Sequence, residues 1–264
     1  LLIRLYYRLT QLHLQGSDAI FYLLKTEVLN RIKELSFNDA TFILHNLINY
    51  ANLIYNRGQK EYIHHVFDIY KRGIETGMIP GNQQMTMDTF LNFLMTCALT
   101  RQFTVARSFV QQQLGKIAPK DRTFVKGFGL AILFFHEGHH QKAVNALSAV
   151  QKVPPLRSFQ AWSLRIRACY CLFIQGKKGY GYKYFYHLSR GFESFINSKR
   201  QISKTRKSAY LNQIRYLRKL ARFHLAEKSS RKTLERWEAE ATTEPHLISR
   251  GWVIGQIRDM IGRL

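Results

Sequence analysis

Apolar residues recur along most of the chain with the spacing of an α-helix. The segment NDATFILHNLINYANLIYNR (residues 38–57) has apolar side chains at intervals of four, three and four residues, which places them on one face of a helix. These residues are Ile43, Leu47, Tyr50 and Ile54. A similar stripe runs through residues 209–225 and consists of Ile214, Leu217, Ala221 and Leu225. No segment shows convincing alternation of apolar and polar residues between hairpin turns, so the chain is predicted to be all-α.

Prolines and glycines divide this helical pattern into regular pairs. All five prolines fall between predicted pairs, where a missing amide hydrogen and a steric clash end a helix. Gly16, Gly58, Gly138 and Gly176 instead fall inside pairs, as short connections between neighbouring helices. The predicted pairs are residues 1–35, 38–76, 83–115, 120–151, 155–197 and 203–241, followed by a single helix at 246–263. Such an alternation indicates a helical-repeat protein.

Four segments align on one repeating frame. They are YANLIYNRGQKEYIHHVFDIY (50–70), FLMTCALTRQFTVARSFVQQQ (93–113), LAILFFHEGHHQKAVNALSAV (130–150) and ACYCLFIQGKKGYGYKYFYHL (168–188). Each position of the frame has its own residue type. A small residue lies on the first helix (Ala51, Ala131, Cys169), a glycine or polar residue forms the turn (Gly58, Arg101, Gly138, Gly176), and a small and then a large residue follow on the second helix (Ala106, Ala143, Gly181; Phe67, Val110, Leu147, Phe185).

This frame resembles the tetratricopeptide repeat, and Pro155 lies where that family often places its terminating proline. The resemblance covers about residues 38–190 and implies a right-handed α-solenoid of antiparallel helix pairs, which we extend to residues 1–264 as a single domain. It also implies a concave surface that holds a partner peptide or domain. We expect the chain to be a piece of a longer protein, because it begins LLIRLYYRL without a methionine, in the middle of a helix.

The excess of positive charge is concentrated in one third of the chain. The formal net charge is +23, and residues 138–226 contribute 18 basic side chains and one acidic side chain, Glu193. Residues 1–137 have a net charge of +5 and residues 227–264 a net charge of +1. Because like charges at helical spacing repel each other, this accumulation suggests a binding surface for an acidic partner.

The densest basic run is KRQISKTRKSAYLNQIRYLRKLAR, residues 199–222. Within it, three arginines share one helical stripe set off from the apolar stripe of the same helix: Arg215, Arg218 and Arg222. Lys207 in the same run, with Arg165 and Arg167 on a neighbouring pair, completes the candidate binding residues. The partner could be an acidic peptide, another domain of the same protein, nucleic acid or anionic lipid, and the alternative is a solvated face without a partner.

The motif HEGHH (residues 136–140) matches the H-E-x-x-H pattern of zinc proteases. That chemistry needs both histidines on one uninterrupted helix and a third protein ligand. Gly138 favours a turn between them, and residues 138–192 contain no acidic residue. The motif is therefore interpreted as the turn between two helices of a repeat, and no metal is expected.

GKKGYGYKY (residues 176–184) has the closely spaced glycines of a phosphate loop, but it follows a predicted helix and lacks a GK[ST] sequence. Its tyrosines and lysines could stack nucleic-acid bases, or they could pack as the wide face of a helix predicted at 178–197. No catalytic constellation stands out, so neither an enzyme nor a cofactor is predicted.

The three cysteines (Cys97, Cys169 and Cys171) do not form a disulfide framework and are interpreted as buried thiols in a reducing compartment, which predicts a cytoplasmic protein. No stretch is long enough for a membrane span. The sequence therefore favours a non-catalytic scaffold that binds an acidic peptide or protein domain. The alternative is binding of an RNA or DNA backbone through residues 138–226.

Overall fold

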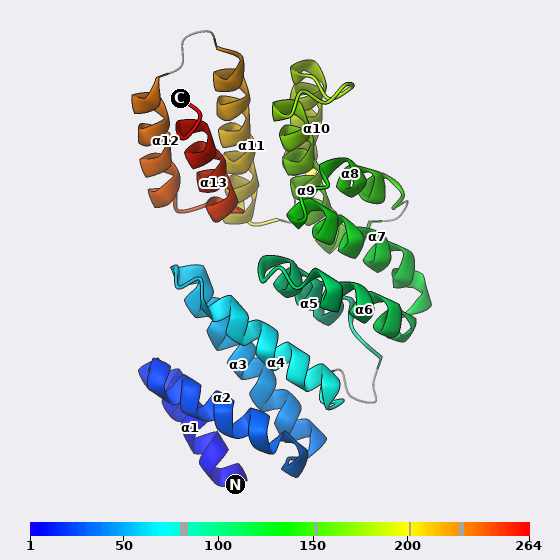
Figure 1. The fold of residues 1–264 in the computed structure, drawn as a ribbon, viewed down its shortest axis with the longest axis vertical. Helices are drawn as coiled ribbons and strands as arrows, with labels where there is room; N and C mark the ends of the chain where they lie inside the picture. Colours follow the sequence, from blue (N-terminus) through cyan, green and yellow to red (C-terminus); the bar gives the residue numbers. More distant parts are fainter. Residues whose placement is uncertain (80–83, 151–152, 201, 227–229) are drawn as a thin grey trace. The chain divides into compact units, whose positions relative to one another are not determined.

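The computed structural model describes residues 1–79, 84–150, 153–200, 202–226 and 230–264. Its described part contains thirteen α-helices, two short 3-10 segments and no β-strand (Figure 1), which confirms the all-α prediction. The helices are α1 (Leu2–Gln15), α2 (Asp18–Arg31), α3 (Phe37–Arg57), α4 (Tyr62–Glu75), α5 (Met87–Leu99), α6 (Phe103–Gln113), α7 (Pro119–His136), α8 (His140–Ser148), α9 (Pro155–Ile174), α10 (Tyr182–Ser198), α11 (Lys204–Leu225), α12 (Arg231–Thr243) and α13 (Arg250–Ile261). The 3-10 segments are Ile32–Glu34 and Leu114–Lys116.

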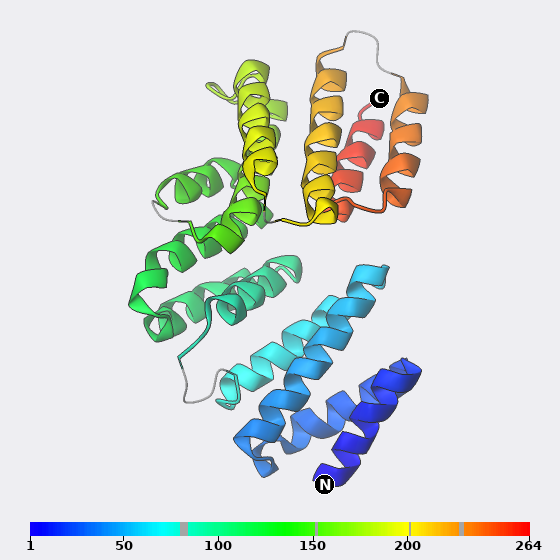
Figure 2. The same cartoon turned by 180° about the vertical axis from the view of Figure 1, so that it is seen from behind.

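The chain folds into two compact units, Leu1–Glu137 and Gly138–Leu264. Within the first unit, α1 packs on α2, α3 on α4, and α5 on both α6 and α7. Within the second unit, α8 packs on α9, the helices α9, α10 and α11 pack on one another, and α13 lies between α11 and α12 (Figures 1 and 2).

The turns between helices lie at the residues that the repeat frame predicts. Gly58, Arg101, Gly138 and Gly176 all have positive φ, at 121°, 58°, 83° and 65°. After three of these residues, the next amide donates to a carbonyl five residues earlier: Gln59 to Ile54, Gln102 to Cys97 and Lys177 to Leu172. This hydrogen bond closes the end of a helix around a left-handed residue. The predicted turn positions are therefore confirmed.

Small residues of the frame pack where predicted, with one exception. Ala51, Ala106, Ala131, Ala143 and Cys169 have no exposed surface. Gly181, expected to pack on the second helix of its unit, is instead an exposed residue at the N-cap of α10. That prediction is wrong because Gly179, with a φ of 87°, adds a second turn after Gly176, and the helix predicted from 178 begins only at Tyr182.

The last helix also begins later than predicted, at Arg250 instead of 246. The preceding segment is tied to the start of α11: the amide of Ile248 donates to the carbonyl of Ala209 (3.2 Å), and the Asn212 side chain donates to the carbonyl of His246 (2.7 Å). These tertiary hydrogen bonds hold residues 246–248 out of the helix. The predicted boundaries at 83 and 151 lie outside the described residues.

All three cysteines are free and buried, as the sequence predicts. Burial raises the pKa of each thiol to about 12. None of the described helices has the length and apolar character needed to cross a membrane.

Candidate binding surface

Helix α11 carries the arginine stripe that the sequence singles out. The hydroxyl of Ser203 caps this helix by accepting a hydrogen bond from the amide of Arg206 (3.3 Å). Ile214, Leu217 and Ala221 are buried, which turns the arginines of the other stripe toward solvent. Leu225, predicted on the apolar face, is 54% exposed because it is the last residue of the helix.

The three stripe arginines line one groove of about 490 Å³. Lys219 and Glu193 complete its charged lining, and Leu211, Asn212 and Ile214 line the rest. The groove therefore combines four cations with one partly exposed apolar residue, Leu211. The structure brings Arg215, Arg218 and Arg222 together as the helical spacing predicts.

Carboxylates already contact much of this stripe. Arg215 pairs with Glu244 (2.5 Å) and Lys219 with Glu240 (3.2 Å). Both carboxylates lie outside the basic region, at the end of α12 and just beyond it. Exposed pairs of this kind contribute only about 0–1 kcal/mol each, so a partner's carboxylate can replace them at little cost.

Arg218 is the most enclosed of the three. Its Nη1 pairs with Glu193 (2.8 Å), its Nε donates to the hydroxyl of Ser189 (2.7 Å), and its guanidinium lies 5.4 Å from the ring centre of Tyr186. Its Nη2 is buried without a hydrogen-bond partner among the described atoms. A buried donor without an acceptor costs free energy, and this nitrogen has no surface through which a partner could reach it.

Arg222 is exposed, and its Nε donates to the hydroxyl of Tyr182 (3.4 Å). That hydrogen bond raises the pKa of the Arg222 guanidinium. Two tyrosines of GKKGYGYKY are thus hydrogen-bonded within the protein, since the hydroxyl of Tyr180 also accepts from Gln141 (2.7 Å). The glycines of that segment follow helix α9, so they lack the strand that a phosphate loop requires.

The remaining candidate residues do not line the groove. Arg167 is buried, its Nε donates to the carbonyl of Ser163 (3.3 Å), and its guanidinium lies 5.6 Å from the ring centre of Trp252 on α13. Burial lowers its pKa to about 10. This position favours a role in joining α9 to α13. Arg165 and Lys207 are half-buried, and their part in binding stays a prediction.

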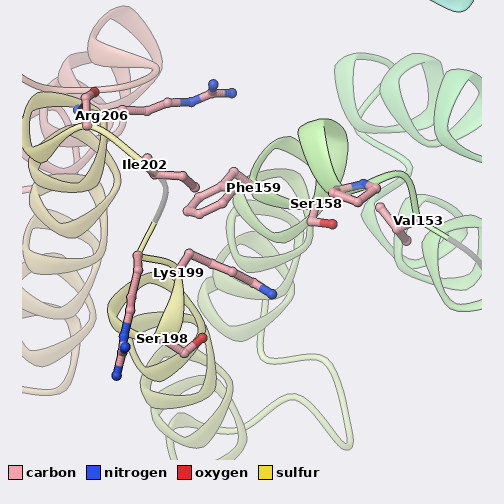
Figure 3. Close-up of a pocket in the computed structure, with 10 residues that line it drawn as sticks. Val153, Ser158, Phe159, Ser198, Lys199, Ile202 and Arg206 are labelled. Atoms are coloured by element: carbon pink, nitrogen blue, oxygen red, sulfur yellow. Dashed lines mark hydrogen bonds between the residues drawn. The ribbon is translucent and has the colours of Figure 1, made fainter.

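A second hollow, which the sequence analysis missed, lies where three helices of this unit end or begin (Figure 3). It has a volume of about 750 Å³. Its lining comes from the start of α9 (Val153, Pro155, Ser158, Phe159), the end of α10 (Ser198, Lys199, Arg200) and the start of α11 (Ile202, Ser203, Arg206). None of the described lining residues is acidic. The signal in the sequence is the pair Lys199–Arg200 followed by Arg206, at the beginning of the basic run.

The HEGHH segment lacks the geometry of a zinc protease. Helix α7 ends at His136, Gly138 has a φ of 83°, and α8 begins at His140, so the two histidines do not share one helix. The carboxylate of Glu137 pairs with Arg107 (2.5 Å). Within the described ranges, no three His, Cys, Asp or Glu side chains gather as a possible metal site.

Comparison of the chain with family models, curated proteins and solved structures finds no match.

Proposed function

We propose that the chain is a non-catalytic binding module that holds an acidic peptide or protein segment on the basic surface of its second unit. Its helix pairs would stack as a tetratricopeptide-like solenoid, an architecture that presents an extended surface to a partner. The observation that carries the proposal is the excess of positive charge in residues 138–226, which have a net charge of +17.

Much of this charge is exposed and has no internal partner. Lys177, Lys178, Lys183 and Arg190 are exposed around α10, and the described part of the chain pairs none of them with a carboxylate. Clustered like charges destabilise the folded state through mutual repulsion. An acidic partner removes that repulsion and gains Coulomb energy, which supports a binding surface over a solvated face.

The lining of the α11 groove favours a protein partner over nucleic acid. Glu193 lines the groove, and Glu240 and Glu244 pair with its cations. These carboxylates would repel a continuous phosphate backbone, whereas the partly exposed Leu211 of the lining offers an apolar contact to side chains of a peptide. Backbone binding of RNA or DNA through residues 138–226 is the alternative function.

The proposal is tested with the full chain and two probes, an acidic peptide with interspersed leucines and poly(U) RNA. The double variant Arg215→Glu/Arg222→Glu should weaken peptide binding by roughly tenfold, since exposed ion pairs contribute up to ~1 kcal/mol each. The matched control is Arg231→Glu/Arg258→Glu on α12 and α13, where two exposed arginines also pair with glutamates. The control should bind the peptide like the unmodified chain.

A salt titration separates the two functions. Backbone binding loses affinity log-linearly with salt, with a slope of about −0.7 per neutralised phosphate on single strands. Peptide binding should depend on salt less steeply and on the leucines of the peptide strongly. Failure of the peptide to bind at low salt, or equal weakening by the control variant, would refute the proposed function.

A further inference from the structure

The lining of the cavity at the meeting of α9, α10 and α11 includes three cations and an apolar wall. In Figure 3, Lys199 extends from the end of α10 toward α9, and Arg206 extends from the start of α11 past Phe159. Arg200 is the third cation of the lining. Val153, Pro155, Phe159 and Ile202 provide the apolar part.

Aromatic rings hold two of these cations in place. The Lys199 amine lies 4.9 Å from the ring centre of Phe195, and the Arg206 guanidinium lies 5.9 Å from that of Phe159. Phe159 is itself buried, with 2% of its surface exposed. Such contacts restrict the side chains without neutralising their charge. The lining of the cavity therefore has positive charge that no described carboxylate of the lining compensates.

The cavity contrasts with the α11 groove in this respect. The groove includes Glu193 in its lining and has Glu240 and Glu244 beside it, so it suits isolated carboxylates among apolar residues. The cavity has three cations and no acidic lining residue, and it suits a group with more than one negative charge. A phosphate monoester has a charge of about −1.5 to −2 at pH 7 and three acceptor oxygens, whereas a carboxylate has only one charge.

The volume sets a second condition on the ligand. At about 750 Å³, the cavity falls within the range of small-molecule sites and exceeds what a phosphate group alone would fill. The wall of Val153, Pro155 and Ile202 offers the remaining space to an apolar group attached to the phosphate.

We infer that this cavity binds a phosphorylated side chain of the acidic partner segment, with the phosphate held by the cations of its lining, Lys199, Arg200 and Arg206, and the attached apolar group against Val153, Pro155 and Ile202. The inference rests on the proposed function, because it names the anchor of the same partner. It makes binding dependent on phosphorylation of that partner.

The test measures binding of four probes to the full chain by calorimetry: an acidic peptide with one phosphotyrosine, its unphosphorylated counterpart, phenyl phosphate and inorganic phosphate. The phosphorylated peptide should bind about tenfold tighter or more than its counterpart, as expected for added charge-assisted hydrogen bonds. Phenyl phosphate should bind more tightly than inorganic phosphate, because only the former fills the apolar part of the cavity.

The variant Lys199→Gln/Arg206→Gln should remove the advantage of phosphorylation and weaken binding of the unphosphorylated peptide much less than binding of the phosphorylated one. Arg190→Gln, which removes an exposed cation of α10 outside the cavity, should leave the advantage intact. Thermal melting checks that each variant is folded. Lys199→Gln/Arg200→Gln, at two exposed residues, replaces the first variant if Arg206 proves necessary for folding.

Two results would overturn the inference: no gain in affinity from the phosphate, or a gain that survives in the cavity variant. In either case, binding of the unphosphorylated peptide would leave the proposed function standing. If neither peptide binds but phenyl phosphate binds in a Lys199-dependent manner, the cavity is a site for a free phosphate ester. That result would refute both the proposed function and the peptide anchor.

Discussion

Replacing Gly129 with alanine tests how closely α7 approaches α5 in the first unit. Gly129 is a buried residue in the middle of α7. A Cβ atom added there would lie 2.6 Å from Cδ1 of Leu94 and 3.7 Å from Cδ2 of Leu91. Both leucines belong to α5 and are almost completely buried.

Two opposing effects set the size of the change. Alanine stabilises a helix interior by about 0.8–1.0 kcal/mol relative to glycine. Overpacking a filled core costs about 1–3 kcal/mol, and Leu94 has no exposed side into which it can move. The overpacking term is larger, so Gly129→Ala should lower the free energy of unfolding by about 1 kcal/mol. That loss corresponds to a Tm lower by about 2–4 °C.

Gly255→Ala in α13 is the matched control. Gly255 lies inside a helix, and an added Cβ would meet no heavy atom within 4 Å. Only the helix effect applies there, so this variant should gain about 0.5–1 kcal/mol. Urea unfolding followed by circular dichroism measures both variants. If Gly129→Ala stabilises the chain as much as Gly255→Ala does, then α5 and α7 are not in the close contact that the structure shows.

Three further predictions concern packing, pH and metal. Ala106→Leu should lower the free energy of unfolding by about 1–3 kcal/mol, because Ala106 is fully buried. Gln111→Leu, on the exposed side of the same helix, should change this free energy by less than about 0.5 kcal/mol. Equal effects of the two substitutions in urea unfolding would contradict the repeat frame. Burial lowers the pKa of His140 in the folded state. As the pH falls, this histidine is therefore protonated in the unfolded state before it is protonated in the folded state. The free energy of unfolding should thus decrease as the pH drops through the ordinary histidine pKa of about 6.5. His140→Gln should reduce the loss of Tm between pH 7.5 and pH 5.5, and an unchanged loss would show that His140 does not contribute. Elemental analysis should find no stoichiometric zinc, and one zinc per chain that disappears in His136→Ala would show that the motif binds metal despite the turn at Gly138.

The sequence alone predicted features that depend on residues close to one another along the chain. Helical periodicity and the turn residues are of this kind, because a turn needs only a residue that tolerates positive φ and a few neighbouring hydrogen bonds. Arg101 illustrates the strength of the repeat frame: it has a φ of 58° where a glycine would be the usual choice. The common stripe of Arg215, Arg218 and Arg222 was equally predictable, since helical spacing determines it.

The start of α13 and the burial of Arg167 depend on tertiary contacts, and the sequence did not predict them. The segment before α13 is held out of the helix by hydrogen bonds to Ala209 and Asn212, which lie more than thirty residues earlier in the chain. Arg167 looked like a surface cation, but the packing of Trp252 from α13 encloses it.

The binding surface shows the same division. The sequence places three arginines on one face of α11, but only the packed unit brings Glu244 to Arg215, across 29 residues of chain. The cavity depends on tertiary structure even more, because its lining comes from the start of α9, the end of α10 and the start of α11. Helical spacing relates residues within one helix, and it contains no information on which helix ends meet in space. The sequence therefore determined the charge available for binding, whereas the packing of the helices decided where that charge is compensated and where it faces an open cavity.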